Sequence, residues 1–316
     1  MGPQGPLRLG AITVAYNCVV CVKQVPDTAR VTGEAMKEDG TVNRSALPAV
    51  FNPEDLNALE EALAIRERYG GTVTVVTMGL PAACEVLRES LFRGADRVIL
   101  LTDRRAAASD TLATSYILSC LVRKLDADIV LCGRQAIDGD TAQVGPQLAE
   151  KLSVPLVTYL EEMTAIDDGV ATIRRNVGNG FEIVRCALPL LVTVMDAANT
   201  PRPPGARKMM KQKKARSQTE VAKAVAGEMP DASEEDRAAE TKTRCDTLAE
   251  KGLLIEQWDL DTVEADLAWC GRDGSPTKVN RIQSIILTGG EYHEVEPTDE
   301  GVAALVTELI EDHTIG

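Results

Sequence analysis

Aromatic and histidine side chains are scarce in this chain of 316 residues. Aromatic residues make up only 3% of it, and the two histidines, His293 and His313, both lie near the C-terminal end. No group of His, Cys and Asp has the spacing of a zinc site, and no GxSxG nucleophile elbow is present. So few acid–base and nucleophilic groups favour a protein that binds a cofactor and lets the cofactor react. We therefore expect no catalytic residue and no metal ligand in this chain.

Long apolar runs and excess positive charge are also missing. No apolar run reaches about 18 residues, so no transmembrane helix is expected. The formal net charge of −14 argues against non-specific binding to nucleic acid. The first residues lack the basic and long apolar regions of a secretory signal, and residues 1–17 are expected to form an extension before the fold. These features predict a cytoplasmic protein without nucleic-acid binding or direct membrane insertion.

The eight cysteines are scattered along the chain, which favours a reducing compartment. Only Cys18 and Cys21 form a CxxC pair, and both lie in the apolar segment CVVCV. Redox and metal-binding pairs usually lie in loops or at helix starts, where a thiolate is exposed. We therefore expect this pair to belong to the core. Because aromatic residues are rare, Val, Ile, Leu and Ala must fill that core, as they do around buried parallel strands.

Apolar segments alternate with amphipathic segments from residue 18 to about residue 196. The expected strands are 18–23, 72–79, 97–103, 127–133 and 188–196. The expected helices are 53–70, 81–94, 109–125 and 147–152, with a β-hairpin over 172–186. Asn52 is the candidate N-cap of the first helix, and Ser109 or Asp110 of the third. The alternation predicts an α/β fold with a doubly wound, mostly parallel, Rossmann-like sheet.

The segment Ile129–Pro146, IVLCGRQAIDGDTAQVGP, joins an apolar strand to a helix through a loop of small and polar residues. Such a junction presents backbone N–H groups and a positive helix end to an anion, usually a phosphate. Gly133, Gly139 and Gly145 are expected to allow close approach of the backbone and positive φ. Pro146 must lie in the first helical turn. The loop spells neither a P-loop nor GxGxxG, so it is a candidate pyrophosphate cradle of another type.

Three further loops are expected to join this one at the carboxyl edge of the sheet, where open α/β sheets bind their ligands. They follow Val22, Val76 and Leu101, and the fourth follows Cys132. A nucleotide site needs several loops that reach one edge.

The same loop, GRQAIDGDTAQVGP, resembles the nucleotide-binding segment of the β subunit of electron-transfer flavoproteins. Similar segments of that family match at Val19–Thr28, Phe51–Leu63, Arg93–Leu101, Ser109–Leu118 and Gly274–Ile282. The resemblance extends from Val19 to about Lys214 and resumes near Leu253.

The resemblance implies an adenine-nucleotide-binding fold with a C-terminal extended arm, in a heterodimer with an α subunit. In one branch of the family this subunit holds AMP as a structural element. In the other it holds a second FAD, which takes electron pairs from NADH. One electron then passes through the α-subunit FAD to a higher-potential acceptor, and the other to ferredoxin or flavodoxin. The redox partner would be a flavin dehydrogenase, a quinone oxidoreductase or a ferredoxin.

The loop favours the FAD branch. The AMP-type loop commonly reads DDD and then CNQTG, whereas this chain has Asp138–Gly139–Asp140 and then TAQVG. Glycine in the middle removes a negative charge and a side chain, which favours approach of a second phosphate. The leading hypothesis is therefore an electron-bifurcating β subunit. The alternatives are a non-bifurcating carrier with AMP, and a nucleotide-sensing module without a redox role.

Carried over position by position, the resemblance implies a set of cofactor-binding residues. The set is Val22, Lys23, Gln24, Asn52, Met78, Asp110, Thr111, Cys132, Gly133, Gln135, Asp138, Gly139, Asp140, Thr141, Ala142, Gln143, Val144 and Gly145. Val22, Asn52 and Met78 would hold the adenosine, the 133–145 loop the phosphates and ribose, and Asp110 and Thr111 the second phosphate. Lys23 and Gln24 would face the flavin ring or simply end a strand. Asp110 could instead be only an N-cap, Met78 core, and Gln135 and Asp138 bonded within the loop.

The resemblance also implies a partner-recognition loop after the last sheet strand. Its residues here are Ala198, Asn199, Pro201 and Arg202. The family loop often reads LNEPRY, and the apolar anchor expected near Ala198 is reduced to a methyl group. Because large anchors usually carry such contacts, docking to an acyl-CoA dehydrogenase in the usual manner is not expected.

The composition changes after Asp196 and suggests the domain boundaries. Residues 18–196 would form the nucleotide- or FAD-binding domain. Residues 197–252 would hold the recognition loop, a basic stretch and an insertion, 218–247, expected to be flexible or loosely helical and to alter partner choice. The basic stretch is either a solvated arm or a dock for an acidic partner. Residues 253–316 are expected to pack on the partner subunit.

Overall fold

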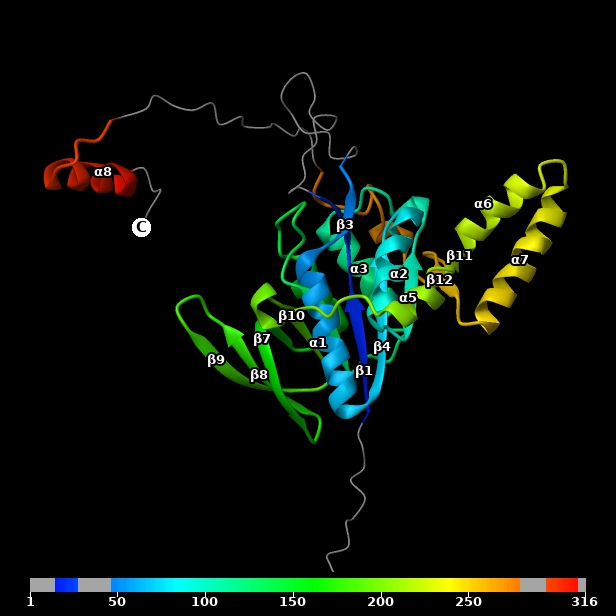
Figure 1. Ribbon diagram of the computed structural model, residues 1–316, viewed down its shortest axis with the longest axis horizontal. Helices are drawn as coiled ribbons and strands as arrows, with labels where there is room; N and C mark the ends of the chain where they lie inside the picture. Colours follow the sequence, from blue (N-terminus) through cyan, green and yellow to red (C-terminus); the bar gives the residue numbers. More distant parts are fainter. Residues whose placement is uncertain (1–14, 28–46, 279–293, 312–316) are drawn as a thin grey trace, which may run out of the picture.

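A computed structural model describes residues 15–27, 47–278 and 294–311 (Figure 1). Most of the expected N-terminal extension and both histidines lie outside these residues. Tyr16 and Asn17, expected to belong to that extension, are already part of the first strand. No helix within the described residues is long and apolar enough to cross a membrane.

A ten-stranded sheet in the order β11-β12-β5-β4-β1-β6-β10-β7-β8-β9 forms the centre of the molecule. Its parallel strands are β1 (Tyr16–Cys21), β4 (Gly71–Met78), β5 (Arg97–Leu101), β6 (Ile129–Gly133), β10 (Leu190–Val194), β11 (Arg216–Ser217) and β12 (Leu254–Trp258). The strand β7 (Leu156–Asp167) pairs parallel with β10 and begins an antiparallel meander with β8 (Val170–Asn176) and β9 (Phe181–Ala187). The predicted parallel sheet and the predicted hairpin are confirmed.

Helices cover both faces of the sheet, as the doubly wound prediction requires. They are α1 (Pro53–Tyr69), α2 (Cys84–Arg93), α3 (Thr111–Val122) and α4 (Val144–Leu152). One buried cluster contains Leu59, Leu63 and Leu87 of α1 and α2, and Figure 1 shows these helices on the near face. A second cluster contains Ile117 and Leu148 of α3 and α4. Aliphatic side chains make up most of both clusters, as the scarcity of aromatic residues predicts.

Cys18 and Cys21 lie buried in β1, as expected for core residues, and all eight cysteines are free. A small antiparallel pair, β2 (Gln24–Pro26) and β3 (Ala49–Phe51), lies beside the main sheet. Short 3-10 helices cover Pro81–Ala83, Arg104–Ala106, Asp196–Ala198 and Leu267–Trp269.

The chain reverses its direction of winding between β1 and β6. From β1 it continues outward through β4 and β5, and it then crosses to β6 and β10 on the other side of β1. The last paired residues of these two strands are Cys21 and Cys132. Beyond them the two strands diverge into loops, which is where open α/β sheets hold their ligands.

The insertion 218–247, expected to be flexible or loosely helical, forms two helices. They are α6 (Gln218–Glu228) and α7 (Glu234–Glu250), which extend from the sheet edge in Figure 1. A capping box between Ser217 and Glu220 begins α6. Arg88 of α2 forms an ion pair with Glu220 and donates to the Ala215 carbonyl oxygen at 3.0 Å. These contacts join the start of α6 to α2.

The first part of the C-terminal segment 253–316 packs on this chain itself. The strand β12 pairs with β5, and the Thr277 backbone N–H donates to Asp110 at the start of α3. A short helix, α5 (Ala206–Gln212), packs against α2. The helix α8 (Asp299–Glu311) has no buried residue among those described, so packing of this region on a partner stays a prediction.

Candidate nucleotide-binding site

The loop between β6 and α4 has a backbone that differs from the expected one. None of Gly133, Gly139 and Gly145 has positive φ; the left-handed residues are Asp140, with φ of 49°, and Ala142, with φ of 51°. The expectation of positive φ at the glycines is therefore wrong. Non-glycine residues in this region cost about 1–3 kcal/mol each, and such strain gathers at ligand clamps. Pro146 lies in the first turn of α4, as predicted.

The three glycines of this loop meet different surroundings. A Cβ at Gly133 would lie 2.8 Å from both Asp55 N and Glu54 C, and one at Gly145 would lie 2.8 Å from Thr193 Cγ2. Both glycines are thus required by the packing of the chain. A Cβ at Gly139 would meet nothing within 4 Å. Of the three, only Gly139 faces space that the chain leaves open.

The N-terminal turn of α1 holds the loop in place. Asn52 is fully buried, and its Nδ2 donates to the Gln135 carbonyl oxygen at 2.9 Å while its Oδ1 accepts from Ile137 N at 3.2 Å. It occupies the expected N-cap position, but its side chain makes no capping bond. The Asn52 side chain therefore shapes the loop.

Two buried carboxylates beside Asn52, those of Glu54 and Asp55, also hold the loop in place. Glu54 accepts from Gln135 N at 2.8 Å and from Arg134 Nε at 3.0 Å. Asp55 accepts from Lys23 N at 2.8 Å and from Gly133 N at 3.0 Å. Burial raises the pKa of Asp55 to about 7, against the opposing effect of these two backbone hydrogen bonds.

Sequence reasoning missed Glu54 and Asp55. Acidic residues in the first turn of a helix ordinarily complement its dipole at the surface, so their presence does not signal burial. The one available signal was the polar run NPED placed directly before an apolar helical pattern.

Some charged and polar side chains of the loop form ion pairs or hydrogen bonds with other residues of this chain. Lys23 Nζ forms an ion pair with Asp138, 2.7 Å from Oδ1 and 2.8 Å from Oδ2. Gln135 Nε2 donates to Asp140 Oδ1 at 3.3 Å, as the alternative of internal bonding predicted. The loop after β1 and the loop after β6 are therefore joined at the carboxyl edge, as expected.

The start of α3 meets the start of α4. Asp110 caps α3 by accepting from Ala113 N at 2.9 Å, and it also accepts from Thr277 N at 2.9 Å. Burial acts to raise the pKa of Asp110, but these backbone bonds outweigh it and the pKa is lowered. Thr111 Oγ1 donates to Gln143 Oε1 at 2.8 Å, across the gap between the two helices.

Unused hydrogen-bonding groups gather at this junction. Within the described residues, no acceptor is found for the backbone N–H groups of residues 141–145. Gln147 Nε2 lies 3.4 Å from Thr111 Oγ1, while its Oε1 is buried and without a hydrogen-bond partner in the described chain. Free N–H groups at the positive end of a helix bind anions. The arrangement fits the phosphate part of a nucleotide.

Three further predicted residues, Val22, Met78 and Cys132, lie close to this edge of the sheet and differ in their burial and contacts. Val22 is buried and its N–H donates to the Val76 carbonyl oxygen at 2.9 Å. Met78 is half-buried and packs on the α3 and α4 side of the core, as the core alternative predicted. Cys132 is buried, and a hydrogen bond with Cys21, together with burial, raises the pKa of its thiol. A thiol held neutral in this way is unreactive.

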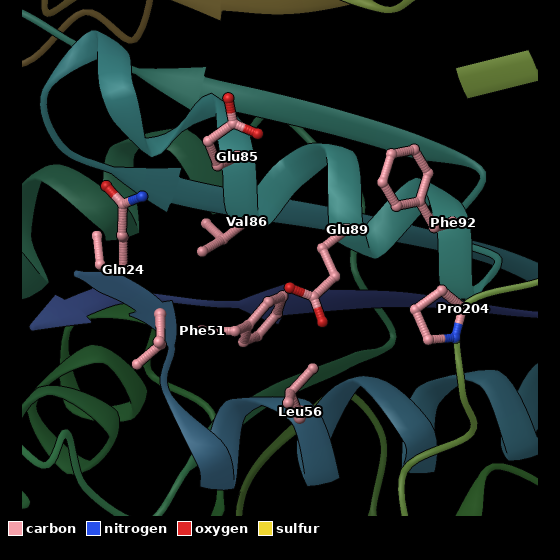
Figure 2. Close-up of a pocket in the computed structure, with 10 residues that line it drawn as sticks. Gln24, Phe51, Leu56, Glu85, Val86, Glu89, Phe92 and Pro204 are labelled. Carbon is pink, nitrogen blue, oxygen red and sulfur yellow. The ribbon is translucent and has the colours of Figure 1, made fainter. Parts of the chain in front are cut away.

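Gln24 lines a separate cavity of about 470 Å³ (Figure 2). The cavity lies between the β2–β3 pair, α1 and α2. Its lining includes Gln24, Phe51, Leu56, Val86, Phe92 and Pro204. No residue of the β6–α4 loop is among the residues that line this cavity.

The predicted partner loop is tied to α1 of this same chain. Arg202 Nε lies 2.9 Å from Glu60 Oε2, and its guanidinium also pairs with Glu67. Asn57 Nδ2 donates to the Asn199 carbonyl oxygen at 2.8 Å. Ala198 packs against the core, and Pro201 is half-buried. These contacts fix the loop, and its binding to a partner stays a prediction.

Comparison with known proteins identifies the family. Residues 39–225, more than half of the chain, match the electron transfer flavoprotein domain. The electron transfer flavoprotein subunit beta of Clostridium acetobutylicum is 39% identical over 300 residues, which are 95% of this chain and 100% of that protein. Protein FixA of Bradyrhizobium diazoefficiens is 37% identical, over 91% of this chain and 89% of its own length.

A third relative is named as part of a larger complex. The Caffeyl-CoA reductase-Etf complex subunit CarD of Acetobacterium woodii is 47% identical over 186 residues, which are 58% of this chain and 70% of that protein. Agreement along almost the whole chain in the first two relatives, together with the doubly wound sheet and its loop, confirms the resemblance. This chain belongs to the electron-transfer flavoprotein family, as a β subunit.

Proposed function

We propose that this chain binds FAD at the β6–α4 loop and serves in an electron-bifurcating electron-transfer flavoprotein. With its α subunit it would accept electron pairs from NADH. One electron of each pair would pass to a low-potential acceptor such as ferredoxin or flavodoxin, and the other through the α-subunit FAD to a higher-potential acceptor. The observation that carries the proposal is the set of backbone N–H groups over residues 141–145, which find no acceptor in the part of the chain that the structure describes and lie at the switch point of the sheet.

The residues present fit a dinucleotide. The N–H groups before and within the first turn of α4 would hold phosphate oxygens, and Gln147 Oε1 would accept a hydrogen bond from a ligand group or its water. A hydrogen bond between Thr111 and Gln143 joins the starts of α3 and α4. Together the two helix starts would contact more oxygens of a diphosphate than of a single phosphate. A bound flavin supplies hydride and single-electron chemistry, and the chain supplies binding and orientation.

The family of this chain and its free cysteines support proposals for its partner and its cellular compartment. Members of this family work as heterodimers with an α subunit, and the redox partner of this one would be a flavin dehydrogenase, a quinone oxidoreductase or a ferredoxin. All eight cysteines are free, which supports a reducing compartment such as the cytoplasm.

The cofactor content of the protein co-purified with its α subunit tests the proposal. We expect two FAD and no AMP per heterodimer after denaturing extraction and chromatography, and reduction of the bound flavin on titration with NADH. One FAD with one AMP would instead identify a non-bifurcating carrier. Absence of any adenine nucleotide from the β6–α4 site would contradict both.

The variant Gly139→Asp tests the choice between FAD and AMP. The Cβ position is open, so we expect an unchanged thermal midpoint and a loss of FAD affinity of about tenfold from charge repulsion, with AMP affinity changed by less than about threefold. The variant Gly139→Asn is the control, because it adds the same bulk without charge. Equal losses in both variants would attribute the effect to bulk.

A further inference from the structure

Asp55 lies beneath the point where β1 and β6 separate. Its Oδ2 accepts from Lys23 N, in the loop after β1, at 2.8 Å, and its Oδ1 accepts from Gly133 N, at the end of β6, at 3.0 Å. The ladder between the two strands ends at the Cys21–Cys132 pair, just before these groups. A single carboxyl group therefore continues the link between the strands past the last pair of the sheet.

The close approach at this point is specific to these residues. A Cβ at position 133 would lie 2.8 Å from Asp55 N and closer still to Asp55 Oδ1. Glycine thus lets the end of β6 come within hydrogen-bonding distance of the carboxyl group. Because Asp55 is buried, it does not present its carboxyl group to a ligand on the loop surface.

We propose that Asp55 is the positioning residue of the nucleotide site, whose carboxyl group sets the separation of the loops that follow β1 and β6. The inference rests on the proposed nucleotide function and assigns a role within that site. Asp55 acts through Lys23 and Gly133, whose chain segments lead to the Lys23–Asp138 ion pair and to the N–H groups of residues 141–145, which have no acceptor among the described residues. The separation of the loops after β1 and β6 determines how well these groups fit a phosphate.

The variant Asp55→Asn tests this role. Its amide can accept from only one of the two N–H groups and presents a donor to the other. A matched control exists at the opposite edge of the same two strands, where Asp128 Oδ2 accepts from Asn17 N of β1 at 2.7 Å just before β6 begins. Asp128→Asn therefore weakens the same strand pair far from the loops.

The readout is the Kd for AMP, measured by calorimetry on the heterodimer after removal of bound nucleotide. We expect a Kd at least about tenfold higher in Asp55→Asn and within about twofold of wild type in Asp128→Asn. Urea unfolding of both variants separates affinity from stability. Equal Kd values in Asp55→Asn and wild type would overturn the inference, as would equal losses in both variants.

Amide hydrogen exchange on the wild-type heterodimer provides a measurement that depends on no variant. Bound AMP is expected to slow exchange at Lys23 and Gly133 together, and to leave Asn17 unchanged. Slower exchange at only one of the Lys23 and Gly133 amides would contradict the proposed link. A wild-type protein that binds neither AMP nor FAD would instead refute the proposed function, which distinguishes the two failures.

Discussion

Replacing Gly133 with alanine is expected to lower the free energy of unfolding by about 3 kcal/mol and to abolish nucleotide binding. The added methyl group would lie 2.8 Å from both Asp55 N and Glu54 C. These are backbone atoms of the first turn of α1, and they cannot move aside as a flexible side chain would. The end of β6 must shift instead, which breaks the hydrogen bond from Gly133 N to Asp55.

Gly139→Ala provides the control, because its methyl group would enter open space in the same loop. Urea denaturation and AMP calorimetry on both variants measure the two effects. We expect Gly139→Ala to unfold within about 0.5 kcal/mol of wild type. A stable Gly133→Ala variant that still binds AMP would show that the packing beneath β6 is looser than the structure indicates.

The second large effect is a dependence of stability on pH that originates at Asp55. Burial raises its pKa to about 7 in the folded state, whereas an unfolded aspartate titrates near pH 3.9. Between these values the folded protein binds a proton that the unfolded chain does not. The free energy of unfolding therefore falls as pH rises through this window, and the contribution of Asp55 is constant above and below it.

Comparison with Asp55→Asn isolates this contribution, because the variant keeps every other titrating group. The unfolding free energy of wild type minus that of the variant is expected to fall by about 3 kcal/mol between about pH 5 and about pH 8. Urea denaturation at several pH values measures the difference. Parallel pH profiles for the two proteins would show that Asp55 titrates near its ordinary value in the fold.

The secondary structure was largely predictable because its signals are local. Valine-rich runs such as β4 and the capped apolar pattern of α3 depend on residues that are neighbours in sequence. The glycine-containing loop before α4 was recognisable for the same reason. The packing of the polar insertion was not readable from its own residues, because α6 and α7 contact each other and the start of α6 forms an ion pair, Arg88–Glu220, with the distant helix α2.

The sequence by itself determined the alternating strands and helices, the position of the candidate anion-binding loop and the family resemblance. It could not show which glycines meet the chain's own atoms, or that Asn52 and Asp55 are buried under the loop. Those facts depend on groups far apart in sequence, such as Asp55 and Gly133, separated by 78 residues. Only tertiary structure decided them, because burial and hydrogen bonding of a polar group are set by what folds around it.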